Sequence, residues 1–185
     1  MELVDLNELI AEDSGLFEPW MPKHIELQVS LAPNLPLIIG DKRQLRQAVS
    51  DMLVRGAIAT AFGASRRGVV ILTTSVEVLT AVSPWSGFVG TPKPEPGRYV
   101  CLAVRDSGDG MDDQVMVHLY DPHLSVRALH DLELASLLRL AKSHDGIVQV
   151  QSGPCMATTF KVFLPVVNAH VSGLPKRTAP ALAPA

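Results

Sequence analysis

The residues best suited by type and spacing to do chemistry form a glycine turn, Asp106-Ser107-Gly108-Asp109-Gly110. It follows the apolar run 99–104 directly, so a strand is expected to deliver it. Gly108 and Gly110 permit positive backbone dihedral angles and close approach of another molecule to the main chain. The Asp106 carboxylate can accept a hydrogen bond from an amino group such as the exocyclic amine of adenine. Taken alone, the same residues are also the ordinary constituents of a tight turn in which Asp106 caps the following segment.

The remaining segments predict the elements that must position this turn. Alternating patterns and β-prone composition predict strands at residues 24–31, 37–39, 69–82, 99–104, 147–151 and 159–164. Apolar spacings of three and four predict helices over 42–62, capped by Asp41, and over 111–120 and 130–143. This order lacks the alternation of a doubly wound sheet. We therefore expect an α+β, two-layer sandwich with a mixed sheet covered on one face by about three helices.

A chain of 185 residues indicates one domain with some tail. Residues 1–22 are mixed in character and broken by Pro19 and Pro22, so we expect a connector there. The folded domain is predicted to span residues 23–165. The Pro- and Ala-rich residues 166–185 are expected to form a disordered tail or linker.

Composition excludes several classes of function. The net charge of -3 offers no basic surplus for gripping a nucleic acid backbone. No apolar run approaches the roughly 20 residues that a membrane helix requires, and the first residues lack the pattern of a secretory signal. Cys101 and Cys155 both lie in apolar stretches, so we interpret them as buried small side chains in a reducing, cytoplasmic protein.

Five stretches that occur in one order carry a resemblance to a known family: Asp41 to Ala48, Asp106 to Met111, Leu119 to Pro122, Ser143 to Ser152 and Thr158 to Pro165. Together they resemble the catalytic ATP-binding domain of sensor histidine kinases, particularly that of hybrid kinases, over about residues 4–165. The resemblance implies the histidine-kinase-type ATPase fold. It also implies that Asp106, Gly108 and Gly110 line the adenine pocket with Thr159 near it, and that the tail is similar to a linker leading to a receiver domain.

The first departure from the family pattern lies in the helix predicted over 42–62. The family motif reads approximately Asn-Leu-Leu-x-Asn-Ala, and its second Asn holds the magnesium ion. Here Asp51 stands at the first Asn and Arg55 at the second. A guanidinium has only donors and cannot coordinate a cation, which puts ordinary magnesium binding in doubt. The alternative interpretation is that Asp51 and Arg55 form a surface ion pair one helical turn apart.

The second departure lies at the start of the helix that follows the ATP lid. Family members carry a Gly-x-Gly-x-Gly-Leu motif whose backbone amides cradle the triphosphate. Residues 129–134 of this chain contain no glycine, and Asp131 and Glu133 replace two of them. These carboxylates would satisfy the helix N-terminus themselves and repel an incoming phosphate by about 4 kcal/mol at about 4 Å. They are otherwise ordinary first-turn acids.

The lid departs as well. Family residues Phe-Glu-Pro-Phe-Phe-Thr-Thr-Lys correspond to residues 120–127, and no glycine lies between Met111 and Asp145 to act as a hinge. Arg127 stands where the family's lysine meets a phosphate. No set of His, Cys and carboxylate residues has the spacing of a metal site, and no pair predicts nucleophilic catalysis, so we assign neither metal nor catalytic residues.

Two functions remain open from the sequence. The first is a degenerate ATP-binding domain of a sensor kinase that binds magnesium–ATP weakly or not at all and docks on a helical dimerisation domain or a receiver domain. Its vestigial nucleotide residues are Asp51, Arg55, Asp106, Gly108, Gly110, Arg127, Asp131, Glu133 and Thr159. In the alternative, an active domain transfers the γ-phosphoryl group to a histidine of a separate dimerisation domain, with Arg55 and Arg127 supplying charge. ATP and magnesium are expected as cofactors only in that alternative, so whether the chain is an enzyme stays open. A corollary of the first function is that Arg55 reaches Asp131 or Glu133.

Overall fold

The computed structural model describes residues 1–17, 21–63, 68–80, 87–89, 95–112, 114–116 and 132–167. Within these ranges, no helix combines the length and the apolar character needed to cross a membrane.

Six strands form the main sheet, in the spatial order β2-β4-β6-β8-β7-β5. Their bounds are Ile25–Ser30 (β2), Gly68–Leu79 (β4), Gly97–Asp106 (β6), Met156–Pro165 (β8), Ile147–Gly153 (β7) and Phe88–Val89 (β5). Only the β2–β4 pair is parallel, and the other pairs are antiparallel. The mixed sheet and the accompanying helices confirm the predicted α+β fold class.

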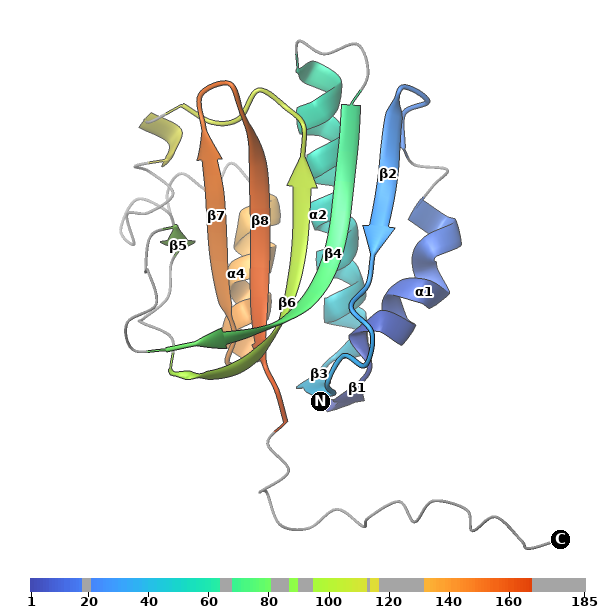
Figure 1. Ribbon diagram of the computed structural model, residues 1–185, viewed down its shortest axis with the longest axis vertical. Helices are drawn as coiled ribbons and strands as arrows, with labels where there is room; N and C mark the ends of the chain where they lie inside the picture. Colours follow the sequence, from blue (N-terminus) through green and yellow to red (C-terminus); the bar gives the residue numbers. More distant parts are fainter. Residues whose placement is uncertain are drawn as a thin grey trace, which may run out of the picture.

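Helices α2 (Lys42–Phe62) and α4 (Leu132–Ser143) cover one face of the sheet, and α1 (Leu6–Phe17) packs beside α2 (Figure 1). Helix α2 has the bounds predicted from its apolar spacing. Its N-cap is Asp41, whose carboxylate accepts hydrogen bonds from the backbone N–H groups of Arg43 and Gln44. One stripe of this helix is buried against the sheet. This packing fixes the position of the helix relative to β4 and β6.

The N-terminal segment corrects the sequence prediction. Residues 1–22 are not a simple connector, because β1 (Glu2–Val4) pairs antiparallel with β3 (Ile38–Gly40), and the first turns of α1 are buried. The α1 side chains that join the main core are Leu6, Leu9 and Ile10. Strand β1 is too short to show a period, and its partner lies more than thirty residues away, so local pattern does not predict it.

The opposite face of the sheet carries a second, smaller apolar cluster. Its members are Leu79, Tyr99, Cys101, Ala103, Ile147 and Phe163, with Phe88 of β5 packed against them. The connection between β4 and β6 contributes β5, which pairs with β7 and forms one edge of the sheet. The two long bent ends of β4 and β6 cross this face near one end of the sheet (Figure 1).

The cysteines differ from one another. Cys101 is buried in the second cluster, and burial raises the pKa of its thiol to about 12. Cys155 is exposed, so the expectation that both are buried is wrong for this residue. It lies in the turn between β7 and β8 with φ of 56°, a left-handed conformation that favours glycine. A turn interrupts the inward and outward alternation of the strands, which explains why the apolar neighbours of Cys155 misled the prediction.

Candidate functional site

A cavity of about 230 Å³ lies between the C-terminal half of α2 and the turn that follows β6. Its lining residues are Arg55, Ala59, Phe62, Gly63, Asp106, Asp109, Gly110, Met111 and Thr158. Two predicted site residues from distant parts of the sequence, Arg55 and Asp106, therefore meet in one place. The volume is below the range of about 300–1,000 Å³ that is typical of ligand pockets.

Asp106 lies at the buried end of the cavity and is only 3% exposed. Its Oδ1 accepts a hydrogen bond of 2.9 Å from the backbone N–H of Gly108, which closes the turn. Burial raises the pKa of the Asp106 carboxyl, and the N–H groups of Gly108 and Thr158 and the charge of Arg55 offset that effect only in part. Asp106 therefore has both of the roles considered for it: its side chain caps its own turn, and it also lines the cavity.

The two glycines of the turn are there for close backbone contacts. A Cβ atom on Gly108 would lie 2.7 Å from the carbonyl oxygen of Ala59 in α2. Gly110 has φ of 77°, and a Cβ atom there would lie against the carbonyl oxygens of Gly153 and Met156. The glycines thus allow the turn to pack between α2 and the β7–β8 hairpin.

The threonine that lines the cavity is Thr158, whereas the sequence pointed to Thr159. Thr158 is buried, and its Oγ1 lies 2.7 Å from the Oγ of Ser152. That Oγ also accepts the backbone N–H of Met111 at 2.9 Å. Thr159 faces the other side of the sheet, beside Arg105 of β6, because neighbouring residues of a strand point in opposite directions.

The guanidinium of Arg55 lies over the aromatic ring of Phe160. Its guanidinium carbon is 4.5 Å from the centroid of Phe160, which is buried in β8. This is the geometry of a cation–π interaction. The position that the family resemblance assigns to a metal-holding amide is therefore taken by a planar cation that stacks on the sheet.

Asp51, one turn before Arg55, links α2 to α4. Its Oδ2 accepts a hydrogen bond of 2.7 Å from the Ser136 hydroxyl, and its Oδ1 accepts one of 2.6 Å from the Gln47 amide. Both carboxylate oxygens are thus occupied by neutral donors. The suggestion that Asp51 serves a surface ion pair gives way to a bridge between the two helices.

The other predicted site residues lie outside the described part of the chain. These are Arg127, Asp131 and the side chain of Glu133. The electrostatic effect of the acidic helix start, and the contact expected between Arg55 and that segment, stay predictions.

Several residues of the site were not predicted from the sequence. Thr158, Ser152 and Met111 form a hydrogen-bonded group behind the glycine turn, and Phe62 and Ala59 close the α2 side of the cavity. The apolar spacing of α2 marks only its buried stripe, so it gave no reason to select Phe62, which is 86% exposed. The hydroxyl pair depends on how β7 and β8 are registered, which no local pattern reveals.

The raised pKa of Asp106 predicts a pH dependence of stability. Because the folded state favours the protonated carboxyl, the contribution is fully present below the ordinary aspartate pKa and is lost as pH rises through the raised pKa. The Asp106→Asn side chain stays neutral. The free energy of unfolding of the Asp106→Asn variant is therefore expected to increase relative to that of wild type as pH rises from the acidic range to neutrality. Urea denaturation across that range measures the difference, and a difference that is constant or falls with pH contradicts this account.

The chain is similar to sensor histidine kinases in sequence and in fold. No family model matches it. The Sensory histidine kinase/phosphatase NtrB of Azospirillum brasilense is 29% identical over 176 residues, which cover 94% of this chain and 42% of that protein. NtrB of Rhizobium leguminosarum bv. phaseoli is 26% identical over 163 residues, covering 88% of this chain and 40% of that protein. The chain thus spans about two fifths of the length of these curated relatives.

Solved structures agree in fold. The catalytic domain of histidine kinase ThkA superposes with a TM-score of 0.62 at 18% identity, covering 90% of this chain and 97% of that one. Full-length ShkA in complex with AMPPNP gives 0.61 at 22% identity, covering 91% of this chain and 31% of that one. The homologues of this chain are sensor histidine kinases, and its fold is that of their catalytic ATPase domains.

The described residues fit the two parts of a magnesium nucleotide unequally. Asp106 offers a buried carboxylate to an amino group, as an adenine would require. A metal finds no comparable site, because Arg55 donates only and both oxygens of Asp51 already accept hydrogen bonds. Among the described residues, no group of three or more His, Cys, Asp and Glu side chains could hold a metal ion. The described residues therefore do not fit magnesium.

Proposed function

We propose that this chain is the ATPase-type domain of a sensor histidine kinase in which binding of magnesium–ATP is weak or lost. In this role it acts as a regulatory module that docks on a helical dimerisation and phosphotransfer domain or on a receiver domain. The observation that carries the proposal is Arg55, which stands where the family resemblance expects a metal-holding amide and whose guanidinium lies over Phe160. A fixed positive donor at that point excludes the cation that would neutralise a triphosphate.

The Asp51–Ser136 bridge supports the same proposal. It joins α2 to α4, the helices between which the family resemblance places the phosphates. The bridge holds a carboxylate at 2.7 Å from its donor, so a phosphate entering there meets a negative charge and must break a hydrogen bond. Loss of phosphate binding thus has two separate causes in the described residues, in addition to the acidic helix start predicted from Asp131 and Glu133.

A second candidate is the active catalytic domain. The intact turn around Asp106 and its cavity favour it, as does the likeness to ShkA, whose structure contains AMPPNP. In that case Arg55 and Arg127 would supply positive charge to the phosphates, and the γ-phosphoryl group would pass to a histidine of a separate domain. The relative NtrB is named a histidine kinase/phosphatase, and a kinase of that class would supply the histidine-bearing partner domain.

A calorimetric titration of the chain with ATP and magnesium separates the two candidates. We expect no saturable binding below about 1 mM, against the micromolar affinity that corresponds to about 8 kcal/mol. Arg55→Asn alone is expected not to restore binding, because Asp51 and the acidic helix start remain. Arg98→Asn, which removes an exposed arginine of β6 that lines neither the cavity nor the pocket beside Asp51 and Ser136, is the matched control. Micromolar binding by the unmodified chain, with phosphorylation of an added dimerisation domain, would establish the active candidate instead.

A further inference from the structure

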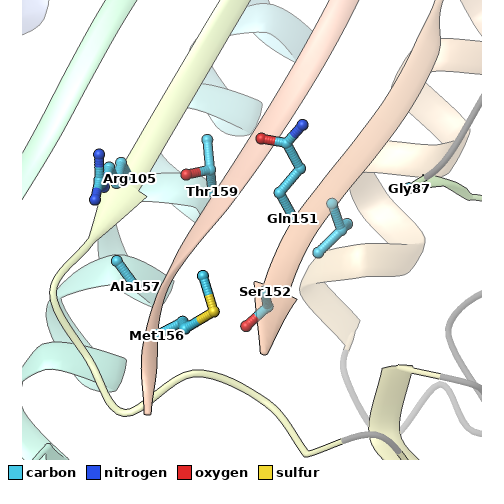
Figure 2. A pocket seen from close by; sticks show the side chains of 8 residues that line it. Gly87, Arg105, Gln151, Ser152, Met156, Ala157 and Thr159 are labelled. Atoms are coloured by element: carbon cyan, nitrogen blue, oxygen red, sulfur yellow. The ribbon is translucent and has the colours of Figure 1, made fainter. Parts of the chain in front are cut away.

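A second pocket, of about 410 Å³, lies on the face of the sheet that the helices leave uncovered. Its lining comprises Arg105, Gln151, Ser152 and Thr159 with Val150, Met156, Ala157 and Gly87. Figure 2 shows Arg105, Thr159 and Gln151 side by side on β6, β8 and β7. The smaller apolar cluster lies on the same face toward Tyr99 and Phe163, so the polar residues mark its open end.

Three hydrogen-bond donors stand in one row of this pocket. Thr159 is directly opposite Arg105 on one side and Gln151 on the other in the strand register. Directly opposite side chains have Cβ atoms about 4.5–5.5 Å apart, so one small group placed over Thr159 is within reach of all three. A guanidinium, a hydroxyl and a carboxamide together can donate to the oxygens of a single carboxylate or phosphate.

Charge balance on this face favours an anion. Lys161, in the next row of β8, is compensated by Glu77, at 3.5 Å between Nζ and Oε1. Within the described ranges, Arg105 has no ion-pair partner and no carboxylate lines the pocket. Among the described residues, the site therefore carries one positive charge that no carboxylate compensates. Arginine and methionine are both enriched where protein surfaces make contacts, and Met156 beside the row is 63% exposed.

The pocket shares its strands with the inner cavity. Arg105 and Asp106 are adjacent in β6 and point to opposite faces, as do Thr159 and Thr158 in β8. Ser152 joins the two sites directly, because it lines the outer pocket and its Oγ bonds to Thr158 and to the N–H of Met111. Thr158 and Met111 both line the inner cavity.

We propose that the outer pocket binds an oxyanion, a carboxylate or phosphate group held by Arg105, Thr159 and Gln151, and that Ser152 transmits its occupancy to the inner cavity. The group comes either from a small acid or from an acidic side chain of a partner protein. This proposal does not depend on whether the inner cavity binds nucleotide.

The test is a titration of the ¹⁵N-labelled chain followed by amide chemical shifts. The probes are inorganic phosphate, succinate and a capped pentapeptide with one central glutamate. We expect saturable shifts at Arg105, Gln151 and Thr159 with a dissociation constant in the millimolar range. Tighter binding of the peptide than of succinate identifies an acidic side chain as the source, and the reverse order identifies a small acid. Absence of saturation with every probe up to about 50 mM overturns the proposal, since that limit is more than tenfold above the expected constant.

Matched variants make the result specific. Arg105→Gln is expected to weaken binding at least about tenfold, because it removes the charge-assisted hydrogen bonds. Arg98→Gln removes the same charge from the far end of β6 and is expected to change the dissociation constant of the probe less than about twofold. Equal losses in the two variants would show a general charge effect and overturn the site. Gln151→Ala, at an exposed position, provides a second variant whose fold is not at risk.

The link to the inner cavity has its own readout. In the unmodified chain, we expect the probe to shift the amide resonance of Met111 as well as those of the pocket. Ser152→Ala removes the bridging hydroxyl and is expected to abolish the Met111 shift while the Arg105 shift persists. A Met111 shift that survives in Ser152→Ala, or that never occurs, overturns the transmitting role of Ser152.

Discussion

Gly110→Ala is expected to destabilise the fold by about 2–5 kcal/mol. The backbone at this position has φ of 77°, which costs an L-residue about 1–2 kcal/mol. The new Cβ would also lie against the carbonyl oxygens of Gly153 and Met156, which belong to the paired strands β7 and β8 and cannot move without breaking the sheet register. Overpacking against such a rigid neighbour typically adds about 1–3 kcal/mol.

Urea denaturation at neutral pH measures this effect as a shift of the midpoint at constant slope. The control is Gly15→Ala, because Gly15 lies in α1 with nothing within 4 Å of its added Cβ. That variant is expected to gain up to about 1 kcal/mol from helix propensity. A Gly110→Ala variant as stable as wild type would show that the turn is free to move away from the β7–β8 hairpin, and the cavity geometry derived from it would be wrong.

The elements that the sequence predicts well are those whose cause is local. Helix α2 is long, its apolar residues recur at helical spacing, and its cap is the residue directly before it. Strand β6 and the turn after it are likewise marked by adjacent residues, from the apolar run to Asp106 and the glycines. Each of these signals can be read within one window of sequence.

The features that the sequence misses depend on distant partners. Asp51 was selected as a site residue, but its bond to Ser136 joins positions 85 residues apart. Thr158 and Thr159 are chemically the same, and only the strand register, which shifts between Gln151 and Gly153, decides which one faces the cavity. A shift of one residue exchanges the two faces of a strand, so a motif match to this region leaves the choice open.

The charge of Arg105 on the open face of the sheet, which no carboxylate among the described residues compensates, could not be predicted from the sequence either. Arg105 reads as an ordinary surface residue beside Asp106. Its meaning depends on Thr159 and Gln151, which approach from two other strands, and on Glu77, which compensates Lys161 but not Arg105. Sheets assemble such rows from residues far apart in the chain, and each strand alone supplies only one member.

His144→Phe is expected to destabilise the fold by about 1–3 kcal/mol. The histidine is 4% exposed and lies where α4 ends. Its Nε2 accepts the backbone N–H of Asp41 at 3.0 Å, so Nδ1 carries the proton and donates to the carbonyl of Leu140 at 2.8 Å. Phenylalanine can make neither bond. It leaves the backbone N–H of Asp41 without a partner, which costs about 1–3 kcal/mol when buried. The Leu140 carbonyl still accepts the backbone N–H of residue 144 and the Ser143 hydroxyl.

The site of this loss matters because Asp41 is the cap of α2. The imidazole fixes the backbone of that cap from the end of α4, so it sets how the two helices that hold Asp51 and Ser136 meet. His24→Phe, at an exposed position before β2, is the matched control and is expected to change stability by less than about 0.5 kcal/mol. Thermal or urea denaturation compares the two. Loss of the hydrogen bond to Asp41 requires the larger loss of stability at His144. Equal stability changes in the two variants would mean that the imidazole contributes only its volume.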